Sequence, residues 1–296
     1  MAGTGNAAGF GARAFRLCRL KGLIMSRNIF SSVLDAVERG AFPRTQKWAW
    51  RGLYSILSRF WRDNDWRFMN YGFVADGAPF PLKAEDEDER AFIGLYHQAL
   101  EDLPVAGARV LEIGSGRGGG SRYIARYYQP ASVVGLDYSP ETVRLARKLN
   151  GDAPALSFQT GDAERLPFAD GSFDVVVNIE SSHCYADVPA FVREVSRVLA
   201  PGGWFTFADM RSRGKLAELD RQLDASGLER VAGLELSPGV IRALDAAEAR
   251  KRRRIDRAWF MRRFMSEFAG AKGSILYKGL KSGSVVYVAR RFRKSA

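Results

Sequence analysis

Val110-Leu-Glu-Ile-Gly-Ser-Gly-Arg-Gly-Gly-Gly120 decides the fold of this chain. Its apolar start predicts a buried strand, and the glycines that follow predict a tight loop leading into a helix. The next apolar run, Val133-Val-Gly-Leu-Asp137, ends in an acid. Such an acid can accept hydrogen bonds from both hydroxyls of a ribose, while the glycine loop lets a ligand approach the backbone. Together the two stretches predict a site for a cofactor that contains adenosine.

Glu112, which precedes the glycine loop, favours S-adenosylmethionine over a dinucleotide as the cofactor. Gly114-Ser-Gly116-Arg-Gly-Gly119 matches the glycine pattern of dinucleotide-binding proteins, but Glu112 lies just before it at the end of the strand. A carboxylate there would repel a pyrophosphate and favour the cationic sulfonium or ammonium group of S-adenosylmethionine. A phosphate-binding loop of the Walker type is excluded, because no Gly-Lys-Ser/Thr follows the glycines.

Three further apolar runs follow the same alternation. They are Ser157–Asp162, Ser172–Asn178 and Val198–Asp209, with helical segments between them. Strands that alternate with helices from about 108 to 210 predict a parallel sheet with right-handed crossovers. The Asp162 side chain and the N–H of Ala163 can together bind the edge of an adenine ring.

Taken in order, the segments from 110 to 209 resemble the motifs of the class I S-adenosylmethionine-dependent methyltransferases. The resemblance implies an α/β, Rossmann-like, seven-stranded sheet that is mostly parallel with an antiparallel last strand. It implies S-adenosylmethionine as methyl donor and S-adenosylhomocysteine as product. It also implies that the region before the glycine loop covers the cofactor, with Tyr71 at the sulfonium end. The residues expected to hold the cofactor are Tyr71, Glu112, Gly114, Ser115, Gly116, Asp137, Tyr138, Asp162, Ala163 and Asn178.

The composition is that of an ordinary globular protein. The chain has 296 residues, of which 46% are hydrophobic and 26% charged, which suits one α/β domain with added segments. No run approaches the ~18–20 apolar residues that a membrane-spanning helix requires. The cysteines, Cys18 and Cys184, and the histidines, His97 and His183, show no metal-ligand spacing. We therefore expect no metal, no disulfide scaffold and a cytoplasmic, reducing location.

The net charge of +12 is concentrated in two places. Residues 1–34 contain lysine and arginine but no acid, which fits a flexible basic tail, a transit peptide or a start at Met25. The run Arg250–Arg254 is predicted to be solvated helix surface, with contact to anionic lipid headgroups as the second reading. No aromatic-lined basic groove is evident, so a nucleic-acid partner is not expected.

The chain divides into three expected parts. Residues 1–46 form a basic flexible segment, 47–104 an aromatic-rich helical cap, and 105–296 the core. The aromatic part of the cap fits either core packing or a lid over the acceptor site. Within the core, the segment from about residue 213 to 268, which follows the fifth strand, is predicted to form helices that enclose the acceptor.

Two local predictions concern the flanks of the sheet. The acidic run Glu85–Glu89 precedes a predicted helix over Arg90–Leu103, because acids favour a helix N-terminus. Near the end of the chain, Ser274–Lys278 and Ser284–Ala289 look like two strands joined by a glycine-flanked turn, which predicts a terminal hairpin.

His183 is the candidate general base. It follows the fourth strand in Asn178-Ile-Glu-Ser-Ser-His-Cys-Tyr185, and ligands of such sheets bind outside the carboxyl ends of the strands. Methyl transfer to an alcohol needs a base, for which histidine is suited near neutral pH. Asp209 ends the fifth strand at the same edge, where it could orient the imidazole and stabilise its protonated form. Position alone equally allows a histidine that only bonds a loop.

A longer resemblance extends from about residue 68. The spacing of His183 and Asp209 is similar to the His–Asp pair of small-molecule O-methyltransferases that act on sugars. The chain also resembles the phthiotriol and phenolphthiotriol dimycocerosate O-methyltransferases, which implies O-methylation of a hydroxyl on a small or lipid-like metabolite such as a polyketide, lipid or glycoside. The matching stretches are Gly94–His97, Gly118–Gly120, Pro130–Ser132, Gly161–Glu164, Glu180–Tyr185, Ala208–Arg211 and Gly273–Tyr277.

Two other functions compete with this hypothesis. Sterol C-methyltransferases are similar in the loop after the fourth strand and carry an acid there, so Glu180 could instead serve C-methylation of a sterol- or terpene-like substrate. The same fold could also bind the cofactor without methylating, as a cyclase or a regulatory protein. His97 is predicted to be structural or to line the acceptor site rather than to act as a base.

Overall fold

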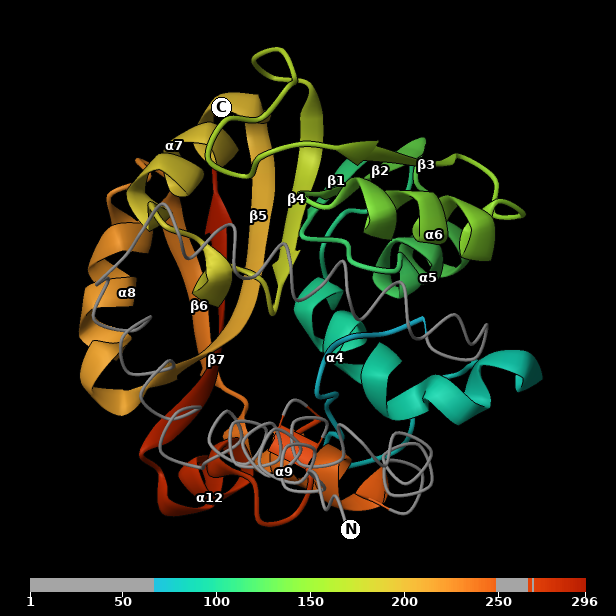
Figure 1. Ribbon diagram of the computed structural model, residues 1–296. Helices are drawn as coiled ribbons and strands as arrows, with labels where there is room; N and C mark the ends of the chain where they lie inside the picture. Colours follow the sequence, from blue (N-terminus) through green and yellow to red (C-terminus); the bar gives the residue numbers. More distant parts are fainter. Residues whose placement is uncertain (1–66, 249–265, 268) are drawn as a thin grey trace, which may run out of the picture.

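The computed structural model describes residues 67–248, 266–267 and 269–296 (Figure 1). The basic N-terminal segment, residues 47–66 of the aromatic-rich cap and the Arg250–Arg254 run lie outside these residues. In the part that is described, no helix is both long and apolar enough to cross a membrane.

Seven strands form one sheet, and their bounds are β1 (Arg109–Ile113), β2 (Ser132–Asp137), β3 (Leu156–Thr160), β4 (Phe173–Ile179), β5 (Leu199–Ser212), β6 (Glu229–Glu235) and β7 (Val285–Arg293). Their order in space is β3-β2-β1-β4-β5-β7-β6. The first five strands are parallel to one another, whereas β7 is antiparallel to both β5 and β6. The expected fold class is therefore confirmed. Chain order reverses between β1 and β4, which is the place where open α/β sheets bind ligands.

Helices cover both faces of the sheet, and their bounds are α4 (Arg90–Leu100), α5 (Gly119–Tyr127), α6 (Pro140–Asn150), α7 (Val188–Val198), α8 (Leu216–Asp224), α9 (Ser237–Ala246) and α12 (Ile275–Ser282). Figure 1 shows α4, α5 and α6 on one side of the sheet and α7 and α8 on the other. Helices α9 and α12 lie near one another below the sheet in this view and share contacts.

The strands of the sheet centre are buried on both faces. In β1, Val110 packs with the cluster beneath α4 and α5, while Leu111 packs with the cluster beneath α7 and α8, and both side chains are fully buried. Adjacent residues of a strand point to opposite faces, so a strand covered on both sides is apolar throughout. This burial explains the continuous apolar runs of the sequence.

Two helices beside the cavity begin where the sequence places a cap. Ser139 accepts a hydrogen bond from the Thr142 N–H at the start of α6, and Asp187 accepts one from the Ala190 N–H at the start of α7. Each cap is followed by a proline in the first turn, where a missing N–H costs nothing. These caps fix the loops that follow β2 and β4.

The predicted terminal hairpin is wrong in its first half. Ser274–Lys278 does not form a strand: Ile275–Ser282 is helix α12, with the Ser274 hydroxyl capping the Tyr277 N–H and Gly283 ending the helix at φ +73°. Leu276 and Leu280 lie four residues apart and pack on the core, which is helical periodicity. The second run does form a strand, β7, but it pairs with β5 and β6 instead.

The expectation of helices throughout 213–268 is also wrong in part. Residues 229–235 form β6, the edge strand, which pairs only with β7. Most of its residues are exposed, so the segment lacks the apolar content by which strands are recognised. Pro238 lies in the first turn of helix α9, which follows β6.

Candidate active site

A cavity opens at the carboxyl edge of the sheet, beside the neighbouring strands β1 and β4, where chain order reverses. It encloses about 1060 Å³, part of which is open to solvent. Its wall is formed by the residues that directly follow strands β1, β2, β3 and β4, together with the segment that precedes η1 (Ala84–Glu89). The predicted residues that line it are Gly114, Ser115, Gly116, Asp137, Tyr138, Asp162, Ala163 and Glu180.

The glycine loop turns sharply beneath the cavity. Gly114 and Gly116 both have positive φ, at +78° and +53°, which favours glycine at these positions. The N–H groups of Gly114 and Ser115 donate to the Leu136 carbonyl at 2.8 and 3.0 Å, so that the loop is fixed to the end of β2. A Cβ on Gly114 would lie 2.3 Å from the Ser181 hydroxyl. The loop therefore needs glycine both for its turn and for the close approach of the β4 loop.

Asp137 ends β2 at the edge of the cavity. Its carboxylate accepts hydrogen bonds from the N–H of Gly116 at 3.0 Å and of Ser139 at 2.9 Å. Burial raises the pKa of Asp137 to about 6, against the opposing effect of these two bonds. A half-buried carboxylate held by backbone groups at a strand end is well placed to accept hydrogen bonds from a ligand diol.

Asp162 and Ala163 lie at the end of β3 and also line the cavity. The Asp162 carboxylate accepts the Glu164 N–H at 3.0 Å, while the Glu164 carboxylate accepts the N–H groups of Ala186 and Asp187. This chain of bonds ties the β3 loop to the beginning of α7. The loop is thereby held against the cavity in the place where the sequence predicted adenine binding.

Glu112 lies behind the cavity wall instead of lining it. Its side chain is buried and accepts hydrogen bonds from the Tyr96 hydroxyl at 2.6 Å and from the Ser121 hydroxyl. Burial raises the pKa of Glu112 to about 7. Tyr96 itself lines the cavity and packs so closely on Gly120 that a Cβ there would lie 2.0 Å from the ring. Sequence analysis missed Tyr96, because its contact with Gly120 joins segments that are distant in the chain.

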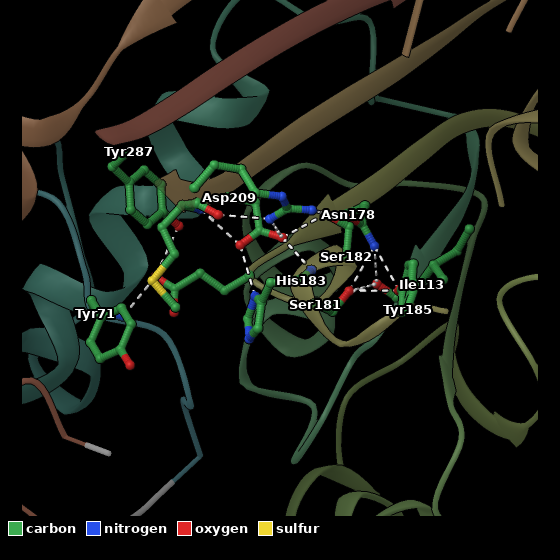
Figure 2. Close-up of polar contacts among 12 residues, drawn as sticks. Tyr71, Ile113, Asn178, Ser181, Ser182, His183, Tyr185, Asp209 and Tyr287 are labelled. Carbon is green, nitrogen blue, oxygen red and sulfur yellow. Dashed lines mark hydrogen bonds and ion pairs between the residues drawn. The ribbon is translucent and has the colours of Figure 1, made fainter. Parts of the chain in front are cut away.

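Asn178 is likewise a structural part of the wall. It is fully buried, and its amide donates to the Ile113 carbonyl, the Ser181 hydroxyl and the Tyr185 hydroxyl at 2.7–3.0 Å (Figure 2). Ser181 and Tyr185 face the cavity from this network and were not predicted. Asn178 therefore joins the ends of β1 and β4, and so sets the shape of the wall.

His183 and Asp209 meet at the carboxyl ends of β4 and β5. The His183 Nδ1 and Asp209 Oδ1 atoms are 2.8 Å apart, and the side chains point toward each other in Figure 2. Asp209 is fully buried and also binds the backbone N–H of His183, the Ser182 hydroxyl and the Arg211 guanidinium. His183 is 20% exposed and adjoins Cys184, which lines the cavity. The structure thus brings the two predicted residues together.

The charges of this cluster oppose the effects of burial. Burial alone would raise the pKa of Asp209, but the cations of His183 and Arg211 hold it below its usual value. Burial would lower the pKa of His183, yet Cys184 and Asp209 raise it well above the ordinary histidine value. The arrangement is suited to accept a proton on the imidazole and to hold it there.

Glu180 occupies a different position in the same loop. Its backbone has φ +47°, which is strained for a residue with a side chain. The carboxyl group accepts hydrogen bonds at Oε1 from the Tyr71 N–H at 2.8 Å and from the Tyr287 hydroxyl at 2.9 Å (Figure 2). Burial raises the pKa of Glu180 to about 8. Tyr71 contacts the loop through its backbone and is not among the residues that line this cavity.

His97 lies on α4, away from this cavity. Its ring stacks on Phe80 at 4.1 Å between centroids, and Nδ1 bonds the hydroxyl groups of Tyr123 and Tyr128. These contacts fit the structural role that was predicted. Among the described residues, no group of three or more His, Cys, Asp or Glu side chains is placed to hold a metal ion.

Comparison with known proteins gives the family. A model described as a methyltransferase domain matches residues 111–207. The phthiotriol/phenolphthiotriol dimycocerosates methyltransferase of Mycobacterium tuberculosis is 36% identical over 261 residues, which cover 87% of this chain and 96% of that protein. The chain is a class I S-adenosylmethionine-dependent methyltransferase.

Two more comparisons extend this result. The fatty-acid O-methyltransferase of Mycolicibacterium smegmatis is 40% identical over 202 residues, covering 67% of this methyltransferase and 73% of that enzyme. The crystal structure of geranyl diphosphate C-methyltransferase from Streptomyces coelicolor has a TM-score of 0.60 at 15% identity and covers 81% of this chain and 98% of that one. At that identity the structural likeness shows the fold alone.

The residues of this methyltransferase fit S-adenosylmethionine. Beside the glycine loop, the Ser115 hydroxyl is buried with no hydrogen-bond partner within the described part of the chain, as expected of a group that a ligand bonds. A Cβ on Gly116 would meet only the Met69 side chain, at 3.4 Å or beyond. The loop thus leaves room for a ligand over its backbone, and Asp137 at the end of β2 could hold the ribose.

Proposed function

We propose that this methyltransferase transfers a methyl group to a hydroxyl oxygen of a small or lipid-like metabolite, with His183 as general base and Asp209 as its orienting partner. The observation that carries the proposal is the 2.8 Å contact between His183 Nδ1 and the buried Asp209 carboxylate beside the donor cavity. The names of the two relatives, which act on dimycocerosates and on a fatty acid, support a lipid-like acceptor.

The chemistry assigns a role to each group. When bound, S-adenosylmethionine supplies a methyl group on a cationic sulfur. An alcohol is a weak nucleophile, so His183 takes its proton at Nε2 as the oxygen attacks. Asp209 bonds Nδ1 and stabilises the resulting imidazolium, as in other His–Asp pairs. Arg211 and Ser182 hold Asp209 in place.

A hydroxyl acceptor explains this pair better than a carboxylate does. A carboxylate is already ionised near neutral pH and needs no base. Among the described residues that line the cavity, the acids are Asp137, Asp162, Glu164 and Glu180. Those of the four that are ionised would disfavour a second anion in the cavity.

The C-methylation alternative depends on Glu180, which would have to stabilise a carbocation as a carboxylate. Glu180 does line the cavity, but burial raises the pKa of its carboxyl group to about 8 even though His183 opposes the shift, so the group is largely protonated at neutral pH. A neutral carboxyl group stabilises a carbocation poorly. For this reason we favour O-methylation.

Incubation with long-chain secondary alcohols and, separately, with fatty acids of equal length tests the proposal. The purified protein receives S-adenosylmethionine, and methyl ethers, methyl esters and S-adenosylhomocysteine are measured by mass spectrometry. We expect methyl ether from the alcohols, dependent on His183. Methyl ester formation alone, or ether formation that survives His183→Ala at full rate, would contradict the proposal.

A further inference from the structure

The methyl donor carries a carboxylate as well as two cationic groups, and the cavity offers few groups to match it. Among the described residues that line the cavity, Arg67 is the only lysine or arginine. The acids named above suit the sulfonium, the ammonium and the ribose of the donor, and none of them suits its carboxylate.

Arg67 lies over the beginning of helix α5. Its backbone carbonyl accepts the N–H of Gly119, the first residue of that helix, at 3.3 Å. The α5 N-terminus has Gly118 at its cap position and no side-chain cap, while the Glu112 carboxyl group accepts the Ser121 N–H in its first turn. Helix N-terminal N–H groups favour an anion, and Gly119 and Gly120 both line the cavity at this point.

Besides the Ser115 hydroxyl, two more buried polar atoms of residues that line the cavity have no hydrogen-bond partner among the described residues. The Arg67 Nε is one of them, and the Asn70 Oδ1 is the other. Asn70 is 9% exposed and lines the cavity, while its amide nitrogen donates to the Phe92 carbonyl at 3.2 Å. Buried polar groups are rarely left unpaired, so an unpaired donor and an unpaired acceptor three residues apart indicate a ligand with complementary groups. An α-amino acid has both a carboxylate and an ammonium.

The other cations of this region are already paired and lie outside the cavity wall. Arg122 bonds the Asp152 carboxylate, and Arg126 bonds both Glu85 and Asp86. They line only a smaller hollow of about 220 Å³ between α4 and α5, which Arg67 also borders. Arg67 is thus the one lysine or arginine of the described residues that lines the donor cavity, although its charge also acts on Asp152 beside the smaller hollow.

We infer that Arg67 and Asn70 bind the amino-acid end of S-adenosylmethionine, with the Arg67 guanidinium on the carboxylate and the Asn70 Oδ1 on the ammonium. Arg67 then makes the enzyme select a donor with an intact carboxylate. The inference rests on S-adenosylmethionine as the donor and is independent of the acceptor and of His183. The segment of residues 67–70 would in this way place the sulfonium toward the loop after β4.

Decarboxylated S-adenosylmethionine tests this assignment, because it lacks only the carboxylate. Calorimetry with both ligands measures the ratio of the two dissociation constants in the wild type, in Arg67→Met and in Arg144→Met. Arg144 is a matched control, since its side chain is 71% exposed on α6 and does not line the cavity.

The wild type and Arg144→Met should bind S-adenosylmethionine about 10-fold or more tightly than its decarboxylated form, the range of a hydrogen-bonded charge pair. Arg67→Met should bring the ratio close to one while leaving the affinity for the decarboxylated form within about twofold. Arg67→Lys should restore part of the preference.

An unchanged ratio in Arg67→Met, or equally weakened binding of both ligands in that variant, would overturn the assignment. Asn70→Ala should weaken the binding of both ligands alike, because both carry the ammonium group. An unaltered affinity for both ligands would show that Asn70 does not bind the ammonium.

Failure of this inference differs from failure of the proposed function. If the wild type binds neither ligand, S-adenosylmethionine is not the donor. If Arg67→Met gives the expected ratio but the enzyme methylates no alcohol, the assignment of the donor site stands. That outcome contradicts only the proposed acceptor class and the proposed role of His183 as base.

Discussion

The cavity joins two regions that are built in different ways. The proposed donor side, formed by Gly114–Gly116 and Asp137–Ser139, consists of consecutive residues in two loops, which backbone N–H groups join to the Asp137 carboxylate. The proposed acceptor side, formed by Glu180, His183 and Asp209 with the Tyr71 N–H and the Tyr287 hydroxyl, gathers groups from four segments far apart in the chain. The difference suggests that the donor side is fixed by the sheet itself, while the acceptor side depends on how outlying segments pack on it.

Replacing His183 should produce the largest effect and should separate the two sides. In His183→Ala we expect turnover to fall by roughly 10²–10⁴-fold, the usual contribution of a general base. The dissociation constant for S-adenosylhomocysteine should change by less than about twofold, because the donor loops do not depend on the imidazole. Steady-state kinetics and calorimetry measure the two quantities.

His97→Ala is the matched control for this comparison. His97 stacks on Phe80 away from the cavity, so its loss should lower stability and leave turnover per folded molecule nearly unchanged. Equal loss of turnover in the two histidine variants would mean that His183 acts through folding alone.

Asp137→Ala should show the opposite pattern. Loss of charge-assisted hydrogen bonds to the ribose should weaken S-adenosylhomocysteine by about 1.5–3 kcal/mol, or roughly 10–100-fold. The turnover number at saturating donor should fall far less than in His183→Ala. Asp174→Ala provides the control, because Asp174 is an acid of β4 that pairs with Arg109 and does not line the cavity. Normal binding by Asp137→Ala would show that another group holds the ribose.

The same contrast explains what the sequence could predict. The donor side follows from local patterns: glycines at positive φ and acids at strand ends are visible one loop at a time. The pairing of His183 with Asp209 was also predictable, because parallel strand ends meet at one edge. Tyr96, Tyr185 and Arg67 were missed, since their place at the cavity depends on contacts between distant segments. The same limit explains α12 and β6, whose short runs take their structure from the core they meet.

Gly120→Ala tests how tightly the donor side is packed. A Cβ at this position would lie 2.0 Å from the Tyr96 ring, which itself bonds the buried Glu112. We expect a loss of about 1–3 kcal/mol in the free energy of unfolding, typical of overpacking. Urea denaturation followed by circular dichroism measures it. Gly214→Ala is the control, because nothing lies within 4 Å of a Cβ at that position. Equal urea midpoints for the two variants would contradict the close contact between Gly120 and Tyr96.

Glu180→Gln should have the smallest effect. With a pKa of about 8 the carboxyl group is largely protonated at pH 7, and a glutamine oxygen can still accept from the Tyr71 N–H and the Tyr287 hydroxyl. Turnover at pH 7 should stay within about threefold of the wild type, whereas Glu180→Ala leaves both donors unpaired and should cost more. A loss of 100-fold or more in Glu180→Gln, with donor affinity intact, would favour a charged Glu180 and the C-methylation alternative.

The pH dependence of methyl transfer to a long-chain secondary alcohol tests the role of His183 most directly. It is best measured as kcat/KM in the Glu180→Gln background, which removes the nearby carboxyl group from the titration. A base must start unprotonated, and the pKa of His183 is raised above the ordinary value of 6.5. The rate should therefore rise with pH through an apparent pKa above 6.5, and Asp209→Asn should move this pKa downward while lowering the maximal rate. A flat profile, or one that Asp209→Asn does not move, would contradict a His183–Asp209 base.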